Sequence, residues 1–222
     1  MSQLPNLAEK RSLTSKIGQF VAKPRQWSFA AKILAAGTVA LTLTTLAHAY
    51  YQQQVGNFHT VIEGEVYRAA QPSAQDVARY KREYGIRTIL NLRGKQDGQW
   101  FIDKENAAKA LGVQIVNFPM NSDEGLTVAQ AGELAKLMKD LPKPLLIHCE
   151  HGANRTGLAS AIYVDEVEQG GKLAALAQLT PYYGHFPIPV IGKYEISESY
   201  WNYMRRDEAL EIVAELQASL TN

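Results

Sequence analysis

The sequence is poor in residues that cross-link a fold or hold a metal. It has a single cysteine, Cys149, among 222 residues. One cysteine excludes an internal disulfide, so the chain depends on an ordinary hydrophobic core for its stability. The five histidines and the cysteine show no metal-ligand spacing. We therefore expect no metal site and no other cofactor, and we find neither an internal repeat nor a low-complexity tract.

The chain also lacks a large net charge of either sign, since its net charge is +1. The balance is uneven along the chain. Residues 1–32 carry six basic residues and one acidic residue, whereas the remainder carries 17 basic and 21 acidic residues. A mildly acidic body argues against nucleic acid as a partner.

A long uncharged run follows the basic leader of residues 1–32. The 19 residues 33–51 contain no charged side chain, and at ~1.5 Å per residue they are just long enough to cross a bilayer core. The basic flank before them predicts a cytoplasmic N-terminus and a body outside the membrane, in the periplasm. A small-x-small pattern that ends at Ala49 also fits signal cleavage after this residue. We favour an uncleaved anchor because the leader is long for a signal. A buried or amphipathic helix fits less well, because the run has no polar face.

Residues 52–57 are polar and are expected to form a short linker before a domain that spans residues 58–222. In this domain strand-like and helix-like segments alternate, which predicts an α/β fold of three layers with a central, largely parallel sheet flanked by helices. Residues 182–189 are aromatic and proline-rich, and we expect a packed connection there, with a substrate-facing loop as the alternative. We expect strands at 58–62, 66–68, 86–92, 113–118 and 145–147, and helices at 74–84, 100–111, 127–141, 155–168, 172–179, 195–204 and 207–220.

The stretch from Leu145 to Gly157 joins an apolar strand to a helix through a short loop. The free N–H groups of a helix N-terminus, together with successive loop amides, can bind an anion. Cys149 stands at the mouth of this loop, where the helix field favours the thiolate. Arg155 returns to the same loop and offers a planar fork to two phosphate oxygens. The sequence therefore predicts a phosphate-binding loop between strand and helix.

Cys149 and Arg155 could also have purely structural roles. A lone cysteine at a strand end is often a small buried side chain, and an arginine at a helix start is often only solvated. The combination with His148, Gly152 and Thr156 in one strand–loop–helix context favours phosphate chemistry.

The pattern His148-Cys149-x-x-Gly152-x-x-Arg155-Thr156-Gly157 resembles the phosphate-binding loop of cysteine-dependent protein tyrosine phosphatases, particularly the bacterial dual-specificity type. Residues 66–73 and 86–93 also resemble stretches of that bacterial group, and the likeness covers about residues 58–205. The resemblance implies a phosphocysteine intermediate, with Cys149 as nucleophile and Arg155 as phosphate ligand. It also implies an acid on the loop one strand–helix unit upstream, for which we select Asp123, with Glu124 as the alternative.

The remaining residues of the candidate loop receive supporting roles. His148 is expected to hold the loop and to bias Cys149 towards the thiolate, and the Thr156 hydroxyl to ease the departure of the sulfur. Arg68, Asn91 and Arg93 are candidates for the rim of the site, although solvated strand ends explain them nearly as well. The expected phosphate-binding residues are Glu150, His151, Gly152, Ala153 and Asn154.

The composition of the loop bears on the substrate. Relatives that take inositol polyphosphates or phosphoinositides tend to place lysines in this loop, whereas here Arg155 is the one firm cation and Glu150 adds a negative charge. A phosphotyrosine-containing protein is therefore favoured, with phosphoserine and phosphothreonine next. The alternatives are a phosphoinositide or inositol phosphate phosphatase, a rhodanese-type sulfurtransferase and a non-catalytic phosphoprotein-binding module. Nothing in the sequence specifies an oligomeric state.

Overall fold

The computed structural model describes residues 28–189 and 193–206. The helix expected at 207–220 and most of the basic leader lie outside these described residues. The chain divides into two compact units, Met1–Thr44 and Thr45–Asn222.

The first described element is a long apolar helix, α2 (Phe29–Gln54). Within Phe29–Gln52 an 18-residue window has a mean hydropathy of 1.6, so length and composition suffice to cross a membrane, although a signal sequence has the same properties. The polar hydroxyls of this stretch bond back to carbonyls one turn earlier, as Thr38 Oγ1 does to Leu34 O at 2.9 Å. Such bonds satisfy a hydroxyl without water, which makes threonine compatible with an apolar helix.

The expected linker at residues 52–57 differs from what the structure shows, because α2 continues to Gln54. Gln52 is buried, and its Nε2 lies 2.9 Å from His59 Nε2. Asn57 is also buried, and it binds the domain through its side chain. These residues therefore form the end of a helix and a turn, in which Gln52 and Asn57 are held by partners within the domain.

A five-stranded sheet forms the centre of the second unit, in the order β1-β2-β5-β3-β4. The pair β1–β2 is antiparallel, whereas β2–β5, β5–β3 and β3–β4 are parallel. This mixed, largely parallel sheet confirms the predicted α/β fold. The strands are β1 (His59–Ile62), β2 (Val66–Ala69), β3 (Thr88–Asn91), β4 (Gln114–Asn117) and β5 (Leu145–His148).

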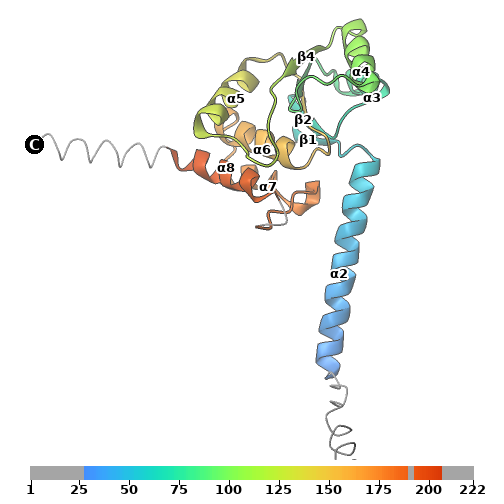
Figure 1. The fold of residues 1–222 in the computed structure, drawn as a ribbon, viewed down its shortest axis with the longest axis vertical. Coiled ribbons are helices and arrows are strands. Elements are labelled where there is room, and N and C mark those ends of the chain that lie inside the picture. The colour runs from blue at the N-terminus through green and yellow to red at the C-terminus, as the bar shows by residue number, and fades with distance from the viewer. Residues whose placement is uncertain (1–27, 190–192, 207–222) are drawn as a thin grey trace, which may run out of the picture. The chain divides into compact units, whose positions relative to one another are not determined.

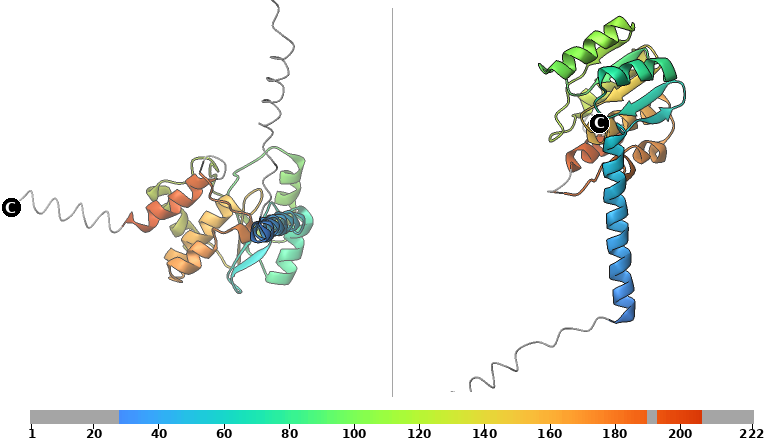
Figure 2. Two further views of the ribbon diagram at one scale, coloured as in Figure 1. Left: turned by 90° about the horizontal axis from the view of Figure 1, so that it is seen from below. Right: turned by 90° about the vertical axis from the view of Figure 1, so that its right-hand side faces the viewer.

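Helices cover both faces of the sheet, as Figure 1 and the two views of Figure 2 show. The helices are α3 (Ala74–Tyr84), α4 (Gln99–Ala110), α5 (Val128–Asp140), α6 (Asn154–Ile162), α7 (Lys172–Ala177) and α8 (Tyr194–Met204), with a π-helical turn η2 (Tyr163–Val167) and a 3-10 turn η3 (Pro181–Tyr183).

Alternate side chains of each parallel strand enter different cores. In β5, Leu145 and Ile147 belong to the larger core, which includes side chains of α5, α6 and α8. Leu146 belongs to the smaller core beneath α3 and α4. All three are fully buried, as expected for a strand with helices on both faces.

Local signals in the sequence set several helix boundaries. Ser73 forms a capping box with Asp76 at the start of α3, and Gly85 ends that helix with φ of +67°. Thr127 forms a second capping box with Gln130 at the start of α5. These side chains satisfy N–H groups that the helices leave unpaired, so the elements begin where the sequence predicts.

Candidate active site

The candidate nucleophile lies at the carboxyl end of the central strand β5. Cys149 follows this strand directly, is 3% exposed and is the free thiol of the chain. The carboxyl ends of parallel strands are where open α/β sheets place their ligand sites. The position therefore fits a site residue, although burial alone would fit a structural cysteine equally well.

Gly152 allows the loop to pack closely against strand β2. Its φ is +68°, and a Cβ at this position would lie 2.6 Å from both Ala69 C and Ala70 N. Any side chain would therefore collide with backbone as well as require a left-handed conformation. Gly152 is one of the expected phosphate-binding residues, and the structure shows that it also allows the loop to approach the end of β2.

Donors outside the loop hold its carbonyl groups. In a trans peptide the carbonyl and the following N–H point in opposite directions. Holding these carbonyls outward therefore turns the following amides toward the other side, the orientation that a backbone anion site requires. The carbonyls of Glu150, His151 and Gly152 accept hydrogen bonds from Gln71 N at 3.0 Å, Asn57 Nδ2 at 2.9 Å and Arg68 Nη2 at 2.9 Å, respectively.

Two arginines flank one carboxylate at this loop. Arg155 Nη2 lies 3.9 Å from Glu150 Oε2, and Arg93 Nη2 lies 3.8 Å from Glu150 Oε1. The Arg93 guanidinium also lies 4.9 Å from the centre of the Trp100 ring. The sequence indicated Arg155 as the one firm cation, and the structure adds Arg93 to it. The carboxylate of Glu150 therefore competes with any anionic ligand for these two arginines.

Removing this internal carboxylate is expected to improve anion binding. Glu150→Gln leaves both arginines without their competing partner, and exposed ion pairs of this kind are worth about 0.2–1 kcal/mol each. We expect inorganic phosphate to bind roughly two- to fivefold more tightly, measured as its inhibition constant in a phosphatase assay. Glu83→Gln, which removes an exposed acid paired with Arg82, is the control. Unchanged or weaker phosphate inhibition in Glu150→Gln would contradict this account.

His148 is fully buried beneath the loop. Its Nδ1 lies 3.0 Å from Cys149 O, and its Nε2 lies 3.4 Å from Lys104 Nζ. Because a carbonyl oxygen can only accept, Nδ1 carries the proton and Nε2 presents its lone pair to the lysine. Burial, followed by the positive charge of Lys104, lowers the pKa of His148 to about 3. The imidazole is therefore neutral near pH 7 and orients the loop rather than supplying charge to Cys149.

Lys104 is a site neighbour that the sequence analysis missed. Its side chain is fully buried in α4, and its Nζ lies 4.6 Å from the centre of the Phe101 ring. Burial lowers the pKa of Lys104 to about 8. The signal was a lysine on the same helical face as Phe101 and Ala108, the buried side of α4.

The three rim candidates have different environments. Arg93 faces the loop, as described above. Arg68 is completely buried and bonds the loop from beneath, so it is not a rim residue. Asn91 is also buried, and its Nδ2 donates to Gly94 O and to Asn117 Oδ1, each at 2.7 Å. Asn91 therefore fixes the turn after β3.

Asp123 lies on the loop between β4 and α5, with its side chain 66% exposed. Its carboxylate forms an ion pair with Lys193, and its backbone N–H donates to Asn121 Oδ1 at 2.9 Å. Arg155 Nη1 donates to Met120 O at 3.4 Å, which links the arginine to the start of the same loop. Glu124, the alternative acid, is exposed.

The remaining predicted loop residues differ in their burial and in their contacts. Thr156 is fully buried, and its Oγ1 has no hydrogen-bond partner in the described part of the chain. The Asn154 side chain contacts His185, whose Nδ1 lies 2.8 Å from Asn154 Oδ1. Ala153 is buried and precedes the first residue of α6, whereas His151 is exposed.

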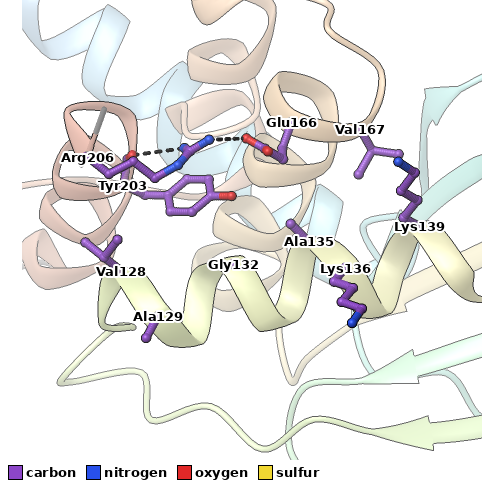
Figure 3. Close-up of a pocket in the computed structure, with 10 residues that line it drawn as sticks. All are labelled: Val128, Ala129, Gly132, Ala135, Lys136, Lys139, Glu166, Val167, Tyr203 and Arg206. Atoms are coloured by element: carbon purple, nitrogen blue, oxygen red, sulfur yellow. Dashed lines mark hydrogen bonds and ion pairs between the residues drawn. The ribbon is translucent and has the colours of Figure 1, made fainter. Parts of the chain in front are cut away.

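A pocket of about 430 Å³ lies elsewhere, between α5, η2 and α8. Figure 3 shows Tyr203 and the Arg206–Glu166 pair on one side of it and Lys136 on α5. None of the predicted site residues lines this pocket. Among the residues that the structure describes, no group of three or more His, Cys, Asp or Glu side chains could hold a metal ion.

Comparisons with known proteins agree with this geometry. Residues 43–184 match the family model described as DSP-PTPase phosphatase fused to NAD+ kinase. Two curated relatives, both the dual specificity protein phosphatase TpbA, come from the Pseudomonas aeruginosa strains UCBPP-PA14 and PAO1. They are 30% and 29% identical to this chain over 119 residues, or 51% of this chain and 49% of theirs. The chain thus spans about half the length of the curated relatives it matches.

Solved structures of phosphatases are also similar to this chain. The crystal structure of P. aeruginosa TpbA is 26% identical, covers 66% of this chain and 84% of its own, and has a TM-score of 0.53. The catalytic domain of the S. cerevisiae PP-IP phosphatase SIW14 is 18% identical, covers 73% and 93% of the respective chains, and also has a TM-score of 0.53, which shows the shared fold alone. From the family match over more than half of its length, we conclude that the chain belongs to the DSP-PTPase phosphatase family whose model is described as fused to NAD+ kinase.

Proposed function

We propose that this protein is a phosphatase that hydrolyses phosphotyrosine in proteins, with phosphoserine and phosphothreonine as slower substrates. The observation that carries the proposal is the loop after β5, where three successive carbonyls are held outward around Cys149. The similarity to TpbA supports it, because TpbA is a dual specificity protein phosphatase and a variant of it has been solved in complex with pTyr.

In the proposed first step, the Cys149 thiolate attacks phosphorus in line with the departing oxygen. Arg155 and the inward-facing loop amides bind the equatorial phosphate oxygens, where negative charge accumulates. Asp123 gives its proton to the leaving phenolate, and a phosphocysteine remains. In the second step water attacks this phosphocysteine while Asp123 takes the proton, and the sulfur departs as thiolate with help from Thr156.

The inositol phosphate alternative rests on the fold. SIW14 and PTPMT1 share the architecture, and PTPMT1 has been solved in complex with PI(5)P. Their identities of 18% and 14% carry no substrate to this chain. Arg93 adds a second cation near the loop, but Glu150 lies between the two arginines and opposes a polyanion.

An assay of the full-length chain in detergent separates these substrate classes. We expect release of phosphate from a phosphotyrosine peptide at a kcat/KM at least about tenfold above that for a phosphoserine peptide or an inositol polyphosphate. A tenfold ratio corresponds to about 1.4 kcal/mol of transition-state discrimination. A preference for the inositol polyphosphate would refute the phosphoprotein proposal but retain the phosphatase.

For the N-terminal part, we propose an uncleaved membrane anchor that places the phosphatase domain in the periplasm. The proposal is supported by the basic leader and by the single described helix that is long and apolar enough to cross a membrane. We expect alkaline phosphatase fused after Asn222 to be active, and the intact protein to remain in the membrane fraction. A soluble product that begins at Tyr50 would instead indicate cleavage after Ala49, and a full-length soluble cytosolic protein would contradict both.

A further inference from the structure

Arg68 is a cation in an unusual place. It lies in β2, and its side chain is completely buried. Its Nη1 donates to Gln178 O and Gln178 Oε1, both at 2.9 Å, and its Nη2 donates to Gly152 O at 2.9 Å. The guanidinium also lies 3.8 Å from the centre of the Tyr183 ring. Each of these partners is uncharged.

No carboxylate balances this charge, since none of the ion pairs found in residues 28–189 and 193–206 includes Arg68. A buried charge without a counter-ion is costly, so proteins rarely retain one without a compensating interaction. Burial lowers the pKa of Arg68 to about 10, while Tyr183 and Cys149 act to raise it. The guanidinium therefore remains charged at neutral pH.

The fold brings Arg68 close to the end of β5, which Cys149 follows. Arg68 pairs with Ile147 in the parallel register of β2 and β5, two residues before Cys149. Its hydrogen bond to Gly152 O reaches the outer side of the phosphate-binding loop. In a poorly solvated interior the field of such a charge is weakly screened.

We propose that Arg68 is a positioning residue whose buried charge has the Cys149 thiolate and the bound phosphate as its counter-ions. It acts through the loop, by holding the Gly152 carbonyl outward, and through space, by favouring negative charge on the far side. This inference rests on the proposed phosphatase function, and it adds a cation that does not touch substrate.

Other charged or titratable groups lie near Arg68 and the loop, and they must be kept constant in any test. His148 on β5 is neutral, as shown above. Near the loop these are Lys104 on α4, Arg93 after β3, Arg155 on α6 and Glu150. Near Arg68 they are Tyr183 in η3, His59 in β1 and His185 after η3.

Gln178 offers a substitution that changes the charge around Arg68 without removing the arginine. Gln178→Glu replaces the amide oxygen, 2.9 Å from Arg68 Nη1, by a carboxylate oxygen of nearly the same shape. The buried arginine then has a counter-ion of its own, while its bond to Gly152 O is retained. We expect the pH of half-maximal Cys149 alkylation by iodoacetamide to rise by about one unit, and phosphate binding to weaken about tenfold.

Gln130→Glu is the matched control. It makes the same change in net charge at the capping box of α5, where glutamate serves as well as glutamine. It should leave alkylation and phosphate binding unchanged. Arg68→Lys is a second variant, which keeps the charge but loses the planar fork. It should retain the pH profile of alkylation more closely than Gln178→Glu while loosening the loop.

These measurements do not depend on turnover, so they separate this inference from the proposed function. A shifted alkylation profile in Gln178→Glu supports Arg68 as the thiolate's partner even if no phosphoester is hydrolysed. A folded Gln178→Glu protein with the wild-type alkylation profile and wild-type phosphate binding would overturn the inference, whatever the enzyme hydrolyses. Thermal unfolding of Gln178→Glu, Gln130→Glu and Arg68→Lys establishes that the comparison is between folded proteins.

Discussion

Cys149→Ser is expected to abolish turnover of p-nitrophenyl phosphate and of a phosphotyrosine peptide. A serine hydroxyl remains protonated near neutral pH, whereas the thiol can present a thiolate to phosphorus. Loss of the nucleophile is expected to lower kcat by at least about 10⁴-fold, the scale on which removal of a catalytic nucleophile acts. Steady-state rates of the wild type and the variant check this expectation.

The fold and phosphate binding should survive this substitution. Cys149 is 3% exposed at the end of β5, and serine is similar in size, so the loop keeps its outward carbonyl contacts. Phosphate binding measured by calorimetry should remain within a few-fold of wild type. Vanadate, an analogue of the phosphate transition state, should inhibit the wild type, and chelators should not. Retention of most of the rate by Cys149→Ser, or loss of wild-type activity in EDTA, would refute the cysteine mechanism.

The sequence predicted the parts of the fold that local signals determine. Ser73 and Thr127 begin helices because each side chain caps N–H groups within the next turn. The run Leu145–Ile147 was recognisable as a strand buried on both faces, since apolar residues continue without alternation. The loop after it was recognisable because glycine, cysteine and arginine occur there at fixed spacing.

Residues that act across the sheet could not be predicted in this way. Arg68 and Lys104 are charged, and charged residues are usually exposed. Their burial follows from pairing and packing between distant segments, such as Arg68 with Gln178 and Lys104 with His148. Asn57 was assigned to a linker for the same reason, because its bond to His151 O joins residues far apart in sequence. Such contacts between distant segments cannot be predicted from local composition.

The role of Asp123 is the part of the mechanism that depends most on movement. Its carboxylate pairs with Lys193 in the structure, and the proposed proton transfer requires Asp123 to leave this partner. The loop is held at its start by the Arg155–Met120 contact, and Leu126 N donates to Ser199 Oγ at 2.9 Å. The proposed role therefore requires the exposed residues between these two points to turn toward bound substrate.

Asp123→Asn is expected to lower kcat on a phosphotyrosine peptide by roughly 10²–10⁴-fold, because the asparagine amide cannot donate the proton that the phenolate needs. The loss should be smaller on p-nitrophenyl phosphate, whose leaving group departs without protonation. Comparing the two substrates in one variant therefore distinguishes a lost acid from a damaged loop, since damage would lower both rates equally. Glu124→Gln is the matched control, with the same change of charge at the next residue. If Glu124→Gln shows the substrate-dependent loss and Asp123→Asn retains the wild-type rate, the proton comes from Glu124.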